Sequence, residues 1–334
     1  MRLIAEGLNK DFDKVEKEDL VKYLAKLEKT NLAENTKKDY KVAIKRFYKW
    51  VNGDAEYPKL VTWIKANVKR SRQKLPEDLL TEEDIKKIVS CATNSRDKAI
   101  LFMLYESGAR IGEIANLKVK DVIFDSDGTL IIVDGKTGMR KVRLVASETY
   151  IKSYLNDSRH IDNPESPLWL KSDKKAITYP AIMKVVRTTV ENADIKKKVT
   201  PHLFRHSRAT YLAKYFTEAQ LCQYLGWTQG SDMPRTYVHM SGRDTDDALL
   251  GLYGKKKIEE HKEKSILIPL TCPRCESTNS PTALFCSKCG SSLTLKTAIE
   301  LEDRRKESDD IMNKLLADED IRKLIANKLK TVNR

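Results

Sequence analysis

The chain has 334 residues, with 62 Lys and Arg against 48 Asp and Glu, and so carries a formal net charge of +14. Because single hydrophobic cores rarely grow to this length, we expect two or three domains. Apolar stretches such as residues 130–133 and 266–270 are far shorter than the about 20 residues needed to cross a bilayer, which excludes an integral membrane protein. The chain turns polar before a signal peptide's apolar run could form, so we expect a cytoplasmic protein.

The positive charge is concentrated near the start of the chain. Residues 1–75 carry 19 basic and 11 acidic side chains, whereas residues 76–254 carry 26 and 24, and residues 255–334 carry 17 and 13. A basic surface attracts polyanions, because each neutralised phosphate releases a counterion. Nucleic acid is therefore the leading class of partner, although lysine-rich helices are equally common as ordinary solvated faces.

Residues 1–75 predict a small helical domain. Leu20, Leu24 and Leu27 recur at helical spacing, and a second apolar stripe runs along residues 40–51. The opposite faces carry a layer of lysines, namely Lys22, Lys26, Lys29, Lys37, Lys38, Lys41, Lys45 and Lys49. The charged stretch that ends at Pro76 interrupts the periodicity and predicts an interdomain linker.

Residues 76–254 predict a second domain, which is mostly helical and has one small sheet. Thr81 and Asp84 have the spacing of a capping box at a helix start. Three short apolar runs separated by glycine-containing turns predict an antiparallel meander, and they cover residues 122–124, 130–133 and 142–145. Helical periodicity returns over residues 181–252. The predicted fold class is mainly α with a small antiparallel β-sheet (α+β).

Four of the six cysteines form two Cys-x2-Cys pairs, and they are Cys272, Cys275, Cys286 and Cys289. Two such knuckles direct four thiolates at one point, as in a zinc ribbon. The alternative, two disulfides, is disfavoured in a reducing compartment. Because four cysteines leave no position for water, we expect structural zinc that stabilises a short segment. We place this zinc ribbon at residues 265–295 and a charged helical tail at residues 296–334.

The middle domain contains a dispersed set of residues whose chemistry suits phosphate. In chain order they are Arg110, Lys136, His202, Arg205, Trp227 and Tyr237. Guanidinium groups match phosphate in a bidentate way and stabilise the extra negative charge of a five-coordinate phosphorus. Lys141, on the same predicted hairpin as Lys136, is an alternative to it, because the register of the turn cannot be read from the sequence.

This ordered set resembles the tyrosine recombinase family, which includes the phage integrases and the Xer-type recombinases. The family pattern is Arg, Lys, His-x-x-Arg, His or Trp, and then Tyr, and every position is matched in order. The resemblance covers about residues 1–254, including the basic N-terminal segment, which is similar to the family's core-binding domain. The ribbon and tail lie outside it, and a four-cysteine ribbon fused to such an enzyme points to an archaeal member. Trp227 stands where most integrases have His, and it cannot act as an acid or base.

The resemblance implies a site-specific recombinase that cleaves DNA through a 3′-phosphotyrosine intermediate, without metal or ATP in the chemical step. Tyr237 would be the nucleophile, Arg110 and Arg205 the phosphate clamp, and His202 the base or hydrogen-bond partner. A proton from Lys136 would release the 5′ oxygen, and Trp227 would donate an indole hydrogen bond and pack the site. The expected assembly is a homotetramer on two synapsed duplex DNA sites.

Two other functions compete with recombination. A type IB-like topoisomerase uses a similar site, although the compact N-terminal domain favours recombination. A catalytically silent DNA-binding regulator with a zinc ribbon would bind DNA and form no covalent adduct. Among neighbouring residues, Glu113 is expected to hold Arg110 or His202, whereas His206 and His239 are expected to support structure.

Overall fold

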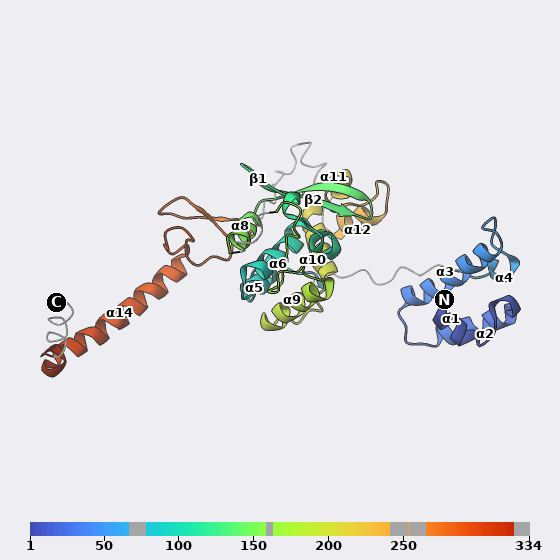
Figure 1. Cartoon of the computed structure of the whole chain (residues 1–334), viewed down its shortest axis with the longest axis horizontal. Helices are drawn as coiled ribbons and strands as arrows, with labels where there is room; N and C mark the ends of the chain where they lie inside the picture. The colour runs from blue at the N-terminus through green and yellow to red at the C-terminus, as the bar shows by residue number, and fades with distance from the viewer. Residues whose placement is uncertain (67–77, 158–162, 241–252, 254–264, 324–334) are drawn as a thin grey trace. The chain divides into compact units, whose positions relative to one another are not determined.

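The computed structural model describes residues 1–66, 78–157, 163–240, 253 and 265–323 (Figure 1). The expected linker up to Pro76, the end of the expected middle domain at residue 254 and the side chain of His239 lie outside the described residues. The chain forms two compact units, Met1–Leu75 and Pro76–Arg334, and each is described by itself. No described helix is long and apolar enough to cross a membrane.

The first unit is a bundle of short helices, which are α1 (Arg2–Leu8), α2 (Lys17–Glu28), α3 (Glu34–Val51) and α4 (Lys59–Thr62). The two stripes seen in the sequence correspond to α2 and α3. Their apolar faces meet in one core, in which Leu20, Ile44 and Val61 are fully or almost fully buried. The hydroxyl of Tyr48 donates to the backbone carbonyl of Phe12 over 3.1 Å, which ties α3 to the 3-10 turn Phe12–Lys14.

Several lysines of the expected basic layer make contacts within this bundle instead of facing solvent freely. Lys37 is only 7% exposed, and its ammonium donates to the carbonyl of Glu28 (3.0 Å) and pairs with the carboxylate of Glu34 (2.9 Å). Lys41 also pairs with Glu28, and Lys45 donates to a backbone carbonyl. The prediction that Lys37 belongs to a free basic face was wrong, because spacing alone does not show which long side chains fold back onto a neighbouring helix.

The second unit packs helices around a small sheet. The helices before residue 241 are α5 (Glu82–Ser90), α6 (Ser95–Ser107), α7 (Ile111–Ala115), α8 (Glu148–Asp157), α9 (Tyr179–Asn192), α10 (Pro201–Ala213), α11 (Glu218–Leu225) and α12 (Met233–Met240). The sheet has the antiparallel order β1-β2-β3, with β1 (Val122–Asp125), β2 (Gly128–Gly135) and β3 (Gly138–Leu144). The predicted mainly α fold with a three-stranded meander is therefore confirmed.

Helix α6 is the centre of this unit, because every residue from Ala99 to Ser107 is buried. Apolar side chains of α5, α8, α9, α10 and the sheet complete one continuous core with α6. The capping box is present as predicted: the Thr81 hydroxyl accepts from the Asp84 amide (3.2 Å), and the Asp84 carboxylate accepts from the Thr81 amide (3.1 Å). The core thus fixes the end of α6, which precedes Arg110, and the helix α10, which carries Arg205.

The hairpin between β2 and β3 has a two-residue loop. Gly135 pairs with Gly138, so Lys136 and Thr137 form the tip of the hairpin. On β3, Val142 and Leu144 face the core and are fully buried. The alternation of a strand places Arg140 on this same inward face.

The C-terminal part contains the short strands β4 (Leu270–Thr271) and β5 (Thr278–Asn279), followed by α14 (Leu295–Ala317) (Figure 1). The segment contacts the rest of its unit, since the hydroxyls of Tyr150 on α8 and Thr282 lie 2.7 Å apart. In the expected tail helix, the apolar stripe of Ile311 and Leu315 is exposed. The end of that stripe, beyond residue 323, lies outside the described residues.

Candidate active site and metal centre

Arg110 is placed by the sharp end of α6. The helix ends at Gly108 with φ +56°, a left-handed conformation that glycine adopts without strain, and Arg110 then caps α7. The Glu113 carboxylate accepts hydrogen bonds from the Arg110 backbone amide (3.0 Å) and from its guanidinium (2.8 Å). Glu113 is buried, whereas about a third of the Arg110 side chain is exposed. Glu113 therefore holds Arg110, as the sequence suggested.

Arg205 lies in the middle of α10, which starts at Pro201 after the cap residue Thr200. Its guanidinium is buried and donates to the backbone carbonyls of Gly108 and Leu225, each over 2.7 Å. Burial, together with the nearby positive charge of Arg110, lowers the pKa of Arg205 to about 10. The side chain therefore remains a cation at neutral pH, fixed beside the start of α7.

Tyr237 lies under Trp227 at the centre of the cluster. The two rings are stacked, with centroids 5.1 Å apart and planes at 12°, and the Arg205 guanidinium lies 5.3 Å from the Trp227 ring. The Tyr237 hydroxyl forms a short hydrogen bond with Nδ1 of His206. Burial raises the pKa of Tyr237 to about 12, and the charge of Arg205 opposes this effect. Tyr237, only 3% exposed, is thus held as a neutral phenol.

Two expected site residues lie at the surface instead. His202 is exposed in the first turn of α10, and Lys136 is exposed at the tip of the β2–β3 hairpin. Among the described residues, neither side chain has a hydrogen bond or an ion pair. The histidine in contact with Tyr237 is His206, one helical turn beyond His202. The sequence pointed to His202 because this residue forms the His-x-x-Arg motif with Arg205, and it assigned His206 a structural role.

The hairpin register separates the two candidate lysines. Lys136 is the first residue of the loop, whereas Lys141 faces solvent within β3, opposite Ile132. The Thr137 hydroxyl donates to the carbonyl of Gly226 over 3.2 Å, which holds the loop against the segment before Trp227. The loop that contains Lys136 therefore lies next to the cluster, whereas Lys141 lies within the strand and does not share this position.

Sequence reasoning missed Arg140, which closes the cluster from β3. One nitrogen of its guanidinium (Nη2) pairs with the Glu113 carboxylate over 2.7 Å, and its Nε donates to the carbonyl of Tyr224 over 3.0 Å. Burial disfavours the ionised form of Glu113, but hydrogen bonds from Arg140 and Arg110 outweigh it and lower the pKa of this carboxyl. The available signal was strand alternation, which points Arg140 inward with Val142.

Charge is unbalanced in this cluster. Arg110, Arg140 and Arg205 lie around one carboxylate, that of Glu113, so two positive charges are left without an opposite partner among these four residues. Fixed cations in a region of low dielectric attract anions strongly and stabilise developing negative charge. The arrangement is suited to an anionic group such as a phosphodiester.

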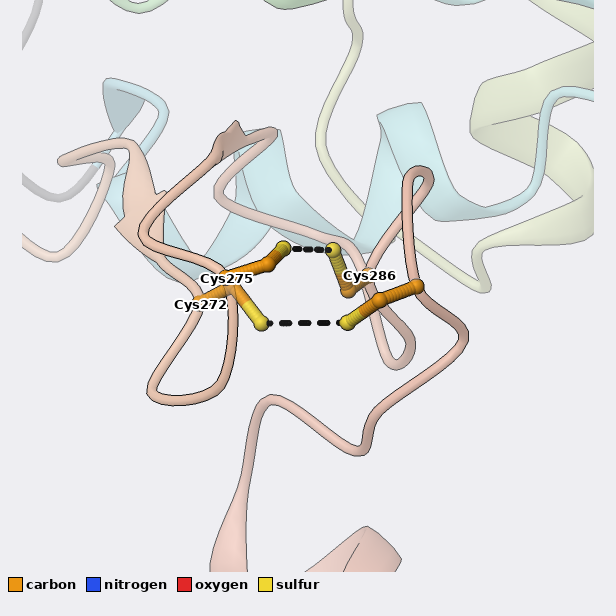
Figure 2. A group of neighbouring side chains, drawn as sticks. Cys272, Cys275 and Cys286 are labelled. Carbon is orange, nitrogen blue, oxygen red and sulfur yellow. Dashed lines mark hydrogen bonds between the residues drawn. The ribbon is translucent and has the colours of Figure 1, made fainter.

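The four cysteines of the C-terminal segment converge on one point (Figure 2). Their sulfur atoms lie within 4.8 Å of one another, with Cys272 3.6 Å from Cys289 and Cys275 3.5 Å from Cys286. All four are free thiols, because a disulfide bond would need about 2.05 Å. A tetrahedral zinc with bonds of about 2.3 Å separates its sulfur ligands by about 3.8 Å. The donor set therefore fits a four-cysteine zinc ion.

The surroundings of Cys275 and Cys286 favour the ionised form of these two thiols, whereas, despite a backbone hydrogen bond from Ser291, desolvation and the neighbouring thiols raise the pKa of Cys289. The backbone amides of Arg274 and Lys288 donate to the sulfur atoms of Cys272 and Cys286, each over 3.4 Å. The Ser277 hydroxyl lies 3.1 Å from the sulfur atoms of both Cys275 and Cys286 and lowers the pKa of these two thiols. Because the thiolate is the form that binds metal, the surroundings of Cys275 and Cys286 favour zinc binding at these two positions.

The fold and the cluster of arginines around a tyrosine define the catalytic domain of a tyrosine recombinase. Residues 78–243 match the phage integrase family, and residues 271–293 match the zinc-ribbon domain. The tyrosine recombinase XerA of Pyrococcus horikoshii is 31% identical over 216 residues, which is 62% of this chain and 70% of that protein. The tyrosine recombinase of Thermosipho africanus is 27% identical over 251 residues, covering 72% of this chain and 86% of that protein.

Solved structures share the fold. A post-cleavage complex of the XerH site-specific recombinase with its difH substrate has a TM-score of 0.57 at 20% identity, covering 73% of this chain and 74% of that one. The Tn1549 transposon integrase in complex with transposon right-end DNA has a TM-score of 0.57 at 18% identity, covering 76% and 91%. The chain belongs to the phage integrase family of tyrosine recombinases and is an enzyme of that family, with a C-terminal zinc-ribbon domain. The resemblance to Xer-type recombinases is confirmed.

Proposed function

We propose that the chain is a site-specific DNA recombinase that cleaves and rejoins strands through a 3′-phosphotyrosine intermediate. The observation that carries this proposal is the continuous contact from Tyr237 through Trp227 to Arg205. A single tyrosine is thereby held next to the site of excess positive charge. Tyr211 on α10 and Tyr215 just beyond its end pack against each other with tilted rings and are not part of this contact.

In the proposed reaction, the Tyr237 oxygen attacks the scissile phosphorus and the bond from phosphorus to the 5′ oxygen breaks. Arg110 and Arg205 stabilise the negative charge that develops on the non-bridging oxygens, which is the largest contribution such sites make. Lys136 gives a proton to the departing 5′ oxygen, a step commonly worth about 10² to 10⁴ in rate. The phosphotyrosine bond conserves the energy of the phosphodiester, so another 5′ hydroxyl reseals the strand without ATP or a metal.

Activation of Tyr237 follows from its surroundings. With a pKa of about 12, the phenol is almost entirely protonated at neutral pH and needs a base or added positive charge to react. His206 already forms a hydrogen bond with the phenol and is placed to accept its proton. His202, exposed one turn earlier on α10, is available as a hydrogen-bond partner for the bound phosphate. Trp227 packs the phenol and offers its indole N–H to the phosphate.

The proposed partner is duplex DNA, on which the enzyme acts as a homotetramer in the cytoplasm. A lambda integrase tetramer bound to a Holliday junction has the same fold, with a TM-score of 0.55 at 15% identity. In this arrangement, residues 1–75 form a DNA core-binding domain and residues 76–254 the catalytic domain. Residues 265–295 form a ribbon with structural zinc, and residues 296–334 form a helical tail.

The test is a nicked suicide duplex, in which the cleaved strand loses a short fragment and cannot be resealed. Incubated without ATP or added divalent metal, the wild type should form a denaturation-resistant protein–DNA adduct, and Tyr237→Phe should form none. Tyr215→Phe, at an exposed tyrosine outside the contact, is the matched control and should react as the wild type does. DNA binding without any adduct would support a silent regulator, and relaxation of plasmids without strand exchange would support a type IB-like topoisomerase.

A further inference from the structure

The Arg140 side chain joins three parts of the catalytic domain that carry different site residues. It projects from β3, just after the hairpin tip that presents Lys136. One end of its guanidinium pairs with Glu113, which in turn holds Arg110. Its Nε donates to the carbonyl of Tyr224, three residues before Trp227. The side chain is 8% exposed, so these contacts are shielded from water.

The end of α11 is held by a row of donors. Its last carbonyls belong to Tyr224, Leu225 and the cap residue Gly226, and they accept hydrogen bonds from Arg140, Arg205 and Thr137, respectively. The C-terminal carbonyls of a helix carry partial negative charge and favour cations. Two of these three donors come from the hairpin, so the hairpin and the segment before Trp227 are fastened together.

Two glycines make room for this connection. Gly226 has φ +66°, and a β-carbon there would lie 2.7 Å from Nη1 of Arg140. At Gly135, a β-carbon would lie 2.2 Å from an oxygen of Glu113. Within the described part of the chain, Nη1 of Arg140 has no hydrogen-bond partner. The guanidinium is thus fixed by its other two nitrogens and by close packing against the backbone.

We propose that Arg140 is a positioning residue for strand cleavage, which sets the Lys136 hairpin relative to the arginine clamp. The inference rests on the proposed function, because it assigns Arg140 to the delivery of the proton by Lys136. Without the guanidinium, the hairpin keeps its strand pairing and the contact from Thr137 to Gly226, but it loses the contacts of Arg140 to Glu113 and to the Tyr224 carbonyl. Lysine is a poor replacement, because an ammonium group cannot present the planar fork that spans a carboxylate and a carbonyl.

The experiment compares two nicked suicide duplexes that differ at one atom. In one, the bridging 5′ oxygen of the scissile phosphate is replaced by sulfur, and a thiolate leaves without needing a proton. The variants are Arg140→Met, which keeps the length of the side chain, and Arg140→Lys, which keeps its charge. The matched control is Arg143→Met on the same strand, whose guanidinium pairs with Asp125 at the surface. Circular dichroism and DNA affinity verify that each variant is folded.

We expect Arg140→Met to form the adduct on the oxygen substrate about 10²-fold more slowly than the wild type, the scale of a lost proton transfer. On the sulfur substrate the loss should be at least about tenfold smaller, because no proton is needed there. Arg140→Lys should show the same pattern with a smaller loss, and it carries the test if the methionine variant does not fold. Arg143→Met should match the wild type on both substrates.

Three results would overturn the inference. Wild-type cleavage rates for both Arg140 variants would show that the hairpin needs no such anchor. Equal losses on the two substrates would show that Arg140 acts on stability or on the arginine clamp and not through Lys136. A wild-type protein that forms no adduct on either substrate would refute the proposed function itself, and the inference with it.

Discussion

Replacing Glu113 with glutamine should destabilise the catalytic domain strongly. The Glu113 side chain is 4% exposed and accepts three hydrogen bonds, at 3.0 and 2.8 Å from Arg110 and at 2.7 Å from Arg140. Breaking a buried ion pair by removing one partner typically costs about 3–5 kcal/mol, because the other charge is left buried and uncompensated. Here two guanidinium groups lose the carboxylate that they share. We expect Glu113→Gln to lower the free energy of unfolding by about 3–5 kcal/mol.

Urea unfolding at pH 7 measures this change, with tryptophan fluorescence as the signal, since Trp169 lies fully buried in the same core. The matched control is Glu165→Gln. Glu165 also pairs with two cations, Lys118 at 2.9 Å and Lys120 at 2.5 Å, but its side chain is 57% exposed. Exposed pairs are screened by water and contribute little, so the control should unfold as the wild type does. Equal destabilisation by the two variants, or an unchanged Glu113→Gln, would refute the reasoning.

The pH dependence provides a second check on Glu113. Its pKa in the folded protein is lowered from an ordinary value of 4.5, so the folded state favours the ionised form of Glu113. The corresponding stability is fully present above about pH 4.5 and is lost as the pH falls through the lower pKa of the folded state. The difference between wild type and Glu113→Gln should therefore be complete at pH 7 and shrink in acid. A difference that stays constant down to pH 3 would contradict this assignment.

Three further predictions concern the metal centre and the tyrosine. Cys286→Ser should lose its zinc, whereas the wild type should release about one zinc ion per chain to a chromophoric chelator; an unchanged metal content would exclude the four-cysteine site. Gly226→Ala should lower the free energy of unfolding more than Gly230→Ala does. A left-handed backbone costs a residue with a β-carbon about 1–2 kcal/mol at either position, but of the two only Gly226 lies against Arg140. Trp227→Ala should lower the free energy of unfolding by about 3–5 kcal/mol and Trp227→Phe by less, since the ring fills a buried stack; similar losses would contradict this packing.

The features of the fold and of the site that the sequence predicted best depend on short-range rules. The Thr81 and Asp84 pair forms its capping box from residues three apart, and the hairpin places Lys136 in its loop because glycines flank the turn. The four cysteines converge because the two cysteines of each knuckle are only three residues apart, so each pair needs little help from the rest of the fold. Local geometry fixes each of these features, so their spacing is informative.

The parts that the sequence did not predict depend on depth within the fold. His202 and His206 lie one turn apart on α10, and only the packing of α12 against that helix decides that His206 meets the phenol of Tyr237. Lys37 has the spacing of a solvated lysine but is buried between α2 and α3. A long polar side chain reaches several ångströms from its backbone, so helical periodicity does not determine what it contacts.

The sequence by itself determined which reactive groups this protein carries: an ordered set of arginines, a tryptophan and a tyrosine, and a cysteine cluster whose spacing suits zinc. The tertiary structure decided how those groups are held. Arg205 reaches Gly108, and Arg140 reaches both Glu113 and Tyr224, across separations of 27 to 97 residues. Such contacts arise only when the core brings α7, α10, α11 and the hairpin together, because burial makes an unpaired charge costly and selects the partners that neutralise it.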